Sequence, residues 1–97
     1  MDEHLPLSDF APLIGPESHY SLHHALHAHT RYQFVRERLL SARDRLILIL
    51  IVRDPAAGRD YRLIYHPVDV QQSVWRLSDA ARCDAEDAEV PLPALVS

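Results

Sequence analysis

The segment 46–52, with the sequence LILILIV, constrains the fold more than any other part of the chain. Successive side chains of a β-strand point to opposite faces, so a strand here would carry aliphatic residues on both faces. Leaving Ile47, Ile49 and Ile51 in water would forfeit about 1.5–3 kcal/mol for each side chain. The segment therefore predicts a strand that is covered on two sides.

A second strand is predicted to follow closely. The segment 61–67 reads YRLIYHP, and it is separated from the first strand, over 44–54, by a stretch that contains Pro55 and Gly58. Proline suits an early position of a turn and glycine suits a left-handed one. The two strands are therefore predicted to form an antiparallel hairpin.

The segments on either side of this hairpin suggest helices. From Glu17 to Ala42 the apolar residues recur with a helical period, and Ser18 is a suitable N-cap. Asp69 is a suitable N-cap for a second helix over 70–83, where apolar residues again recur at helical spacing. The predicted fold class is α+β, with the order helix, strand, strand, helix (αββα).

Three regions are expected along the chain. Residues 1–16 form an apolar arm that contains proline, residues 17–83 form a single α+β domain, and residues 84–97 form a tail that is first acidic and then apolar. Two helices can cover only one face of a hairpin, so a homodimer is expected to cover the other. The alternative is that the arm or the tail covers it. The residues predicted for a dimer or partner interface are Ile47, Ile49, Ile51, Tyr61, Tyr65, Phe34 and Trp75.

Histidines are concentrated between residues 19 and 29. On the predicted helix His19, His23 and His27 follow one another at i, i+4 and i+8, and an i, i+4 pair is a known zinc-ligand spacing. No acidic residue or cysteine lies one helical turn away from these histidines to complete a metal site. A solvated histidine face is therefore the favoured interpretation, with these three histidines as candidate metal ligands and no cofactor predicted.

Charge and composition argue against several classes of function. The net charge is -4, which disfavours nucleic acid as a partner, and the apolar run is far shorter than the ~20 residues that a membrane helix needs. With two glycines the chain cannot build a glycine-rich phosphate loop, and the single Cys83 cannot form an intramolecular disulfide. No secretory signal is evident, so a soluble cytoplasmic protein is expected. Since no catalytic motif stands out either, the protein is expected to have no enzymatic activity.

Three functions remain open at this point. The first is a small regulatory protein, of an inhibitor or antiactivator type in a bacterium or phage, which occludes a surface of a partner protein such as a transcription factor. The second is a metal-binding protein that uses the histidine cluster. The third is a small ribonuclease-type toxin that uses Arg31, Arg38 and His66.

Overall fold

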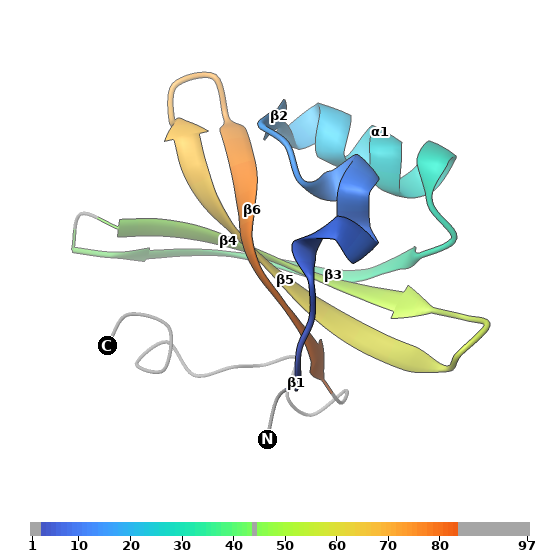
Figure 1. Cartoon of the computed structure of the whole chain (residues 1–97). Helices are drawn as coiled ribbons and strands as arrows, with labels where there is room; N and C mark the ends of the chain where they lie inside the picture. Colours follow the sequence, from blue (N-terminus) through green and yellow to red (C-terminus); the bar gives the residue numbers. More distant parts are fainter. Residues whose placement is uncertain (1–2, 44, 84–97) are drawn as a thin grey trace.

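The computed structural model describes residues 3–43 and 45–83, and within them a curled antiparallel sheet dominates (Figure 1). The strands pair in the order β1-β6-β5-β4-β3, and β2 pairs with β6 beside this path. The 3-10 helix η1 and the helix α1 lie on the same side of the sheet. The bounds are β1 Glu3–His4, η1 Leu7–Leu13, β2 Glu17–Ser18, α1 His19–His29, β3 Gln33–Ala42, β4 Arg45–Asp54, β5 Arg59–Asp69 and β6 Val74–Cys83.

One face of β4 lies in the main hydrophobic core. Leu48, Leu50 and Val52 are buried there against η1 and α1, which supply Phe10 and Leu22 among others. The hydroxyl of Tyr65, on β5, donates a hydrogen bond of 2.7 Å to the carbonyl oxygen of Leu13 and so ties η1 to the sheet. The even-numbered residues of the apolar run thus form the face of the sheet against which both helices pack.

The opposite face of β4 carries the isoleucines. Ile47, Ile49 and Ile51 are only 1–3% exposed, and they form a second cluster with Cys83, against which Leu40 and Ile64 pack. The prediction that the strand is buried on two sides is therefore confirmed. A homodimer is predicted from the sequence because these side chains need cover, but they are already buried within the single chain. Dimerisation therefore stays a prediction, and this face no longer supports it.

The predicted helix from Glu17 to Ala42 is wrong in its second half. The helix α1 ends at His29, where the hydroxyl of Thr30 donates to the carbonyl oxygen of Leu26 at 2.7 Å and accepts from the backbone N–H of Tyr32 at 3.2 Å. The chain then reverses, and Gln33–Ala42 pairs with β4 as the strand β3. Pairing with an apolar strand outweighs a helical period that the sequence also permits.

The predicted helix over 70–83 is also wrong. Asp69 does accept a hydrogen bond from the backbone N–H of Gln72 at 3.2 Å, but this contact closes a turn between β5 and β6. Val74–Cys83 then pairs with β5 along its length. An Asx contact of this kind starts a turn as readily as a helix, and the tertiary pairing decides between them.

The αββα fold class is therefore replaced by a curled antiparallel sheet with one α-helix and a 3-10 helix. The central hairpin is confirmed, since β4 pairs with β5 in antiparallel register from Leu48 with Tyr65 to Asp54 with Arg59. Within 1–16 the chain forms β1 and η1, whereas the predicted tail over 84–97 lies outside the described residues. Among the described residues, no helix is long and apolar enough to cross a membrane.

Candidate metal centre

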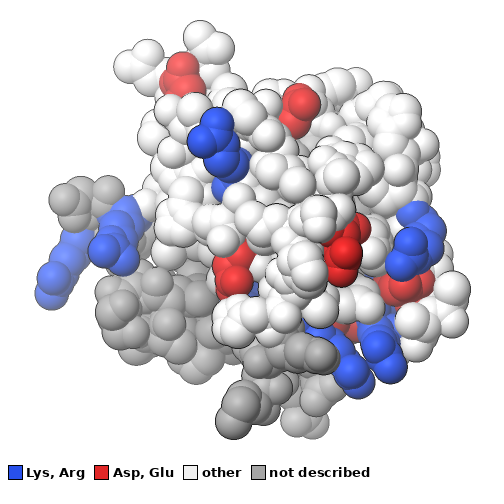
Figure 2. Space-filling model, viewed as in Figure 1, with Lys and Arg blue, Asp and Glu red and all other residues white. Residues whose placement is uncertain are grey.

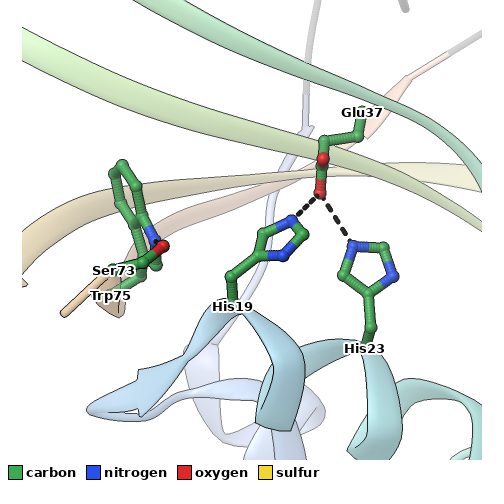
Figure 3. Close-up of polar contacts among 5 residues, drawn as sticks. All are labelled: His19, His23, Glu37, Ser73 and Trp75. Carbon is green, nitrogen blue, oxygen red and sulfur yellow. Dashed lines mark hydrogen bonds and ion pairs between the residues drawn. The ribbon is translucent and has the colours of Figure 1, made fainter.

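Two histidines and a glutamate meet between α1 and β3 (Figure 3). The Nε2 atom of His19 lies 2.7 Å from Oε1 of Glu37, and the Nε2 atom of His23 lies 2.8 Å from the same oxygen. The three ligand atoms all lie within 4.8 Å of one another. Two imidazole nitrogens and one carboxylate oxygen thus converge on one point.

The helix sets the spacing of the two imidazoles. Ser18 caps it by accepting from the backbone N–H of Ser21 at 3.1 Å, as the sequence predicted, so the first turn begins at His19. Residues four apart on a helix lie one above the other, and the rings of His19 and His23 have their centroids 4.6 Å apart. The buried side chains of Leu22 and Leu26 anchor this helix to the core.

The strand β3 supplies the carboxylate. Glu37 lies opposite Leu50 of β4, whose side chain is in the main core, so its own side chain is on the helix-facing side of the sheet. The side chains of His19, His23 and Glu37 remain 41%, 32% and 29% exposed. The cluster therefore lies at the rim of the core, where an ion can reach it from solvent.

The electrostatics of the cluster favour a negative carboxylate. Partial burial by itself would raise the pKa of Glu37, but the hydrogen bonds from His23 and His19 outweigh this effect and leave the pKa below its usual value. Glu37 is therefore ionised at neutral pH, while each imidazole donates its Nε2 proton to the same oxygen. A divalent cation would replace these hydrogen bonds, with each imidazole then carrying its proton on Nδ1 so that its Nε2 lone pair faces the ion.

The dimensions of the cluster suit such a replacement. Zinc binds histidine nitrogen at about 2.0–2.1 Å and carboxylate oxygen at about 2.0–2.2 Å, which places neighbouring ligands of a tetrahedral ion about 3.3 Å apart. The present contacts of 2.7 and 2.8 Å are hydrogen bonds, so each needs to open by about half an ångström. Two histidines and a glutamate leave the fourth tetrahedral position for water or another ligand.

Glu37 is the member of this cluster that the sequence analysis missed. On one continuous helix it would lie about five turns, or about 27 Å, from His19, because an α-helix has about 3.6 residues per turn and rises about 1.5 Å per residue. The reversal after Thr30 brings it back beside the helix instead. Of the three predicted candidates, His19 and His23 are in the cluster, whereas His27 is exposed and outside it.

A pocket adjoins the cluster at His23. It has a volume of about 410 Å³ and lies between the second half of α1 and the start of β3. The ring of Phe34 packs against that of His23, with centroids 5.1 Å apart. The residues that line the pocket are His23, Leu26, His27, Thr30, Arg31, Tyr32, Gln33 and Phe34. On the other side of the cluster, Trp75 donates a hydrogen bond through its indole nitrogen to the hydroxyl of Ser73 at 3.0 Å (Figure 3).

The predicted interface residues are scattered through the fold. Tyr65 and Trp75 are buried in the main core, as the isoleucines are in the second cluster. Tyr61 is half-buried, with its ring against Phe10 at 5.6 Å between centroids. Phe34 differs from these residues because it is 49% exposed. The interface stays a prediction, and Phe34 is its accessible member.

The three residues of the ribonuclease-type hypothesis, Arg31, Arg38 and His66, do not come from one helix. Arg31 precedes β3 and pairs through its Nε with the buried Asp54 at 3.1 Å, whereas Arg38 lies within β3. His66 is on β5, opposite Arg76. In the visible face of Figure 2, basic and acidic side chains are interspersed.

No protein-family model matches this chain, and comparisons with curated proteins and with solved structures found no match.

Proposed function

We propose that this protein binds a divalent transition-metal ion, with zinc as the reference ion, through His19, His23 and Glu37. The convergence of both Nε2 atoms on one carboxylate oxygen is the observation that carries this proposal. Imidazole and carboxylate are ligands that zinc accepts together. The proposal revises the favoured interpretation of a solvated histidine face, because the missing acidic ligand comes from β3.

The helix and the sheet hold the ligands before a metal arrives. His19 and His23 are on a capped helix, and Glu37 is in a strand that is paired along its length with β4. A site on regular elements loses less conformational freedom on binding than a site on loops. The absence of enzymatic activity stays a prediction, and the role proposed here is binding.

Removing a ligand should weaken zinc binding. Isothermal titration of the wild-type protein with zinc at pH 7.5 is expected to show one ion per chain. The variants His19→Ala, His23→Ala and Glu37→Gln should each lower the affinity at least about tenfold, because each deletes one of three protein ligands. The control is His24→Ala, which removes an exposed histidine of the same helix that lies outside the cluster. Equal loss in the control, or unchanged affinity in all three variants, would contradict the site.

The zinc affinity should fall with pH. Zinc binds imidazole through an unprotonated nitrogen, so protons compete with the metal as the pH is lowered from 7.5 to 5.5, and a loss of at least about tenfold is expected. Glu37 stays ionised in this range because its pKa is lowered from 4.5. The stability that its contacts contribute is present above pH 4.5 and is lost as the pH falls through the lower folded value. Titrations at several pH values measure this dependence, and an affinity independent of pH would exclude histidine ligands.

We also propose, as a second candidate, that the protein regulates a partner protein by occluding a surface of it. The support comes from β3, where Phe34 is 49% and Leu39 is 59% exposed. Among the described strands β3 is at the edge of the sheet and pairs with β4 alone. An exposed edge strand with apolar side chains fits an extended segment of another protein, which would add to the sheet as a further strand.

Substitutions on β3 test this second candidate. The variants Phe34→Asp and Leu39→Asp should abolish stoichiometric capture of a partner that the wild-type protein retains from native lysate, since a charge would be placed in a desolvated contact. Val70→Asp is the matched control, because Val70 is 62% exposed and lies in the turn after β5. Mass spectrometry reads the result. If all three variants still retain the partner protein, β3 is not part of the interface.

A further inference from the structure

We propose that the pocket beside His23 binds a small organic carboxylate, which occupies the fourth coordination position of the metal and pairs with Arg31. This inference rests on the proposed metal site. It adds the chemical class of the ligand that the site would take.

The pocket and the metal cluster share a wall. His23 belongs to both, and the ring of Phe34 packs on it from the pocket side. Of the three ligands His23 alone lines the pocket, so a metal bound to it would be reached from the pocket on the His23 side. Its open position accepts an oxygen donor, and carboxylate oxygen is such a donor for zinc.

The pocket is suited to negative charge. None of the described residues that line it is acidic, whereas Arg31 and two imidazoles are among them. The guanidinium of Arg31 is held by its Nε contact with Asp54 at 3.1 Å and lies 5.0 Å from the ring centroid of Tyr32. A guanidinium that is already oriented loses less freedom when it pairs with a carboxylate.

The C-terminal end of a helix carries partial negative charge, which disfavours a carboxylate beside it. At the end of α1 this charge is reduced. The carbonyl oxygen of Leu26 already accepts a hydrogen bond from the hydroxyl of Thr30 at 2.7 Å. Partial negative charge at a helix end comes from carbonyl groups without partners, and this contact satisfies one of them.

The size and the apolar part of the pocket limit the ligand. A volume of about 410 Å³ is in the lower part of the range for small-molecule sites, which is about 300–1,000 Å³. Phe34 provides apolar surface for a hydrocarbon body, while Tyr32 and Gln33 provide hydrogen-bonding groups. A monocarboxylate with a compact apolar body fits this combination.

Benzoate is the probe, and benzamide is its neutral control of the same shape. The full chain is first titrated with zinc alone, and the zinc-loaded and zinc-free forms are then titrated with each compound. Benzoate should bind the zinc-loaded form at least about tenfold more tightly than the zinc-free form. It should also bind the zinc-loaded form at least about tenfold more tightly than benzamide binds either form. Backbone amide shifts of residues 30–34 in NMR spectra should follow the benzoate titration.

The outcomes separate this inference from the metal proposal. If zinc binds and benzoate binds no better than benzamide, the metal proposal stands and the carboxylate inference is wrong. If zinc does not bind, both are wrong. Benzoate binding that is equal with and without zinc would overturn the coordination of the carboxylate by the metal.

Two variants test the pocket itself. Arg31→Gln should lower the benzoate affinity at least about tenfold and leave the zinc affinity unchanged. Because Arg31 also pairs with the buried Asp54, Gln33→Glu gives a second test that leaves this pair intact. It adds a negative charge at an exposed position of the pocket wall and should weaken benzoate several-fold, whereas Gln72→Glu, at an exposed turn outside the pocket, should not. Equal effects of Gln33→Glu and Gln72→Glu would overturn the pocket assignment.

Discussion

Replacing Leu50 by alanine is expected to lower the free energy of unfolding by about 3–5 kcal/mol. Leu50 is fully buried in the main core, in the central part of β4, and its cross-strand neighbours are Glu37 on β3 and Leu63 on β5. Hydrogen bonds to both flanking strands hold the backbone in place, so the cavity left by the substitution cannot collapse. The loss therefore combines the transfer free energy of the deleted methyl groups with a cavity term.

Urea unfolding followed by circular dichroism measures this loss. The matched control is Leu39→Ala, because Leu39 is on the neighbouring strand β3 and is 59% exposed. The control should cost less than about 1 kcal/mol, since its side chain leaves most of its surface in water in the folded state. Similar losses at the two positions would show that the core is not centred on β4.

Replacing Gly15 by alanine is expected to cost at least about 2 kcal/mol. Gly15 has a φ of +83°, a region that side chains disfavour. A Cβ atom there would lie 2.5 Å from the carbonyl oxygen of Trp75 and 2.9 Å from the backbone nitrogen of Glu17. Both neighbours are backbone atoms, and they cannot move aside as the end of a side chain would. The strain therefore has to be relieved by displacing β2 or β6.

Gly58 is the control for this substitution. It also has a positive φ, of +64°, but no atom lies within 4 Å of the position that a Cβ would take. Gly58→Ala should therefore cost only the conformational penalty of about 1–2 kcal/mol. The difference between the two variants measures the contribution of the close approach to β6. Equal losses would show that the close contact at Gly15 costs nothing.

The hairpin could be predicted because its signal is local and strong. The apolar run over 46–52 has no solvated face, and the turn between the strands contains Pro55 and Gly58. The structure places these strands as β4 and β5, with the first within one residue of its predicted bounds and the second extended by two residues at each end. A continuous apolar run that turn residues bound leaves few alternatives to a buried strand.

The sequence indicates two of the three residues of the candidate metal centre, His19 and His23, as candidate ligands, although it favours a solvated histidine face. The spacing of His19 and His23 within one helix is a local property, and the structure retains it. The partnership with Glu37 is not local, because it spans 18 residues of chain and depends on the reversal after Thr30. The sequence contains the ligands but shows no period that would link them.

The sequence by itself determined the central hairpin, the burial of its first strand on two faces, the capped start of α1 and the pair of histidines on it. Each of these depends on residues that are close together in the chain. Only the tertiary structure decided that Gln33–Ala42 and Val74–Cys83 are strands, and therefore that Glu37 meets the histidines. The physical reason is that both segments have mixed periods, so their conformation follows from the apolar hairpin with which they can pair.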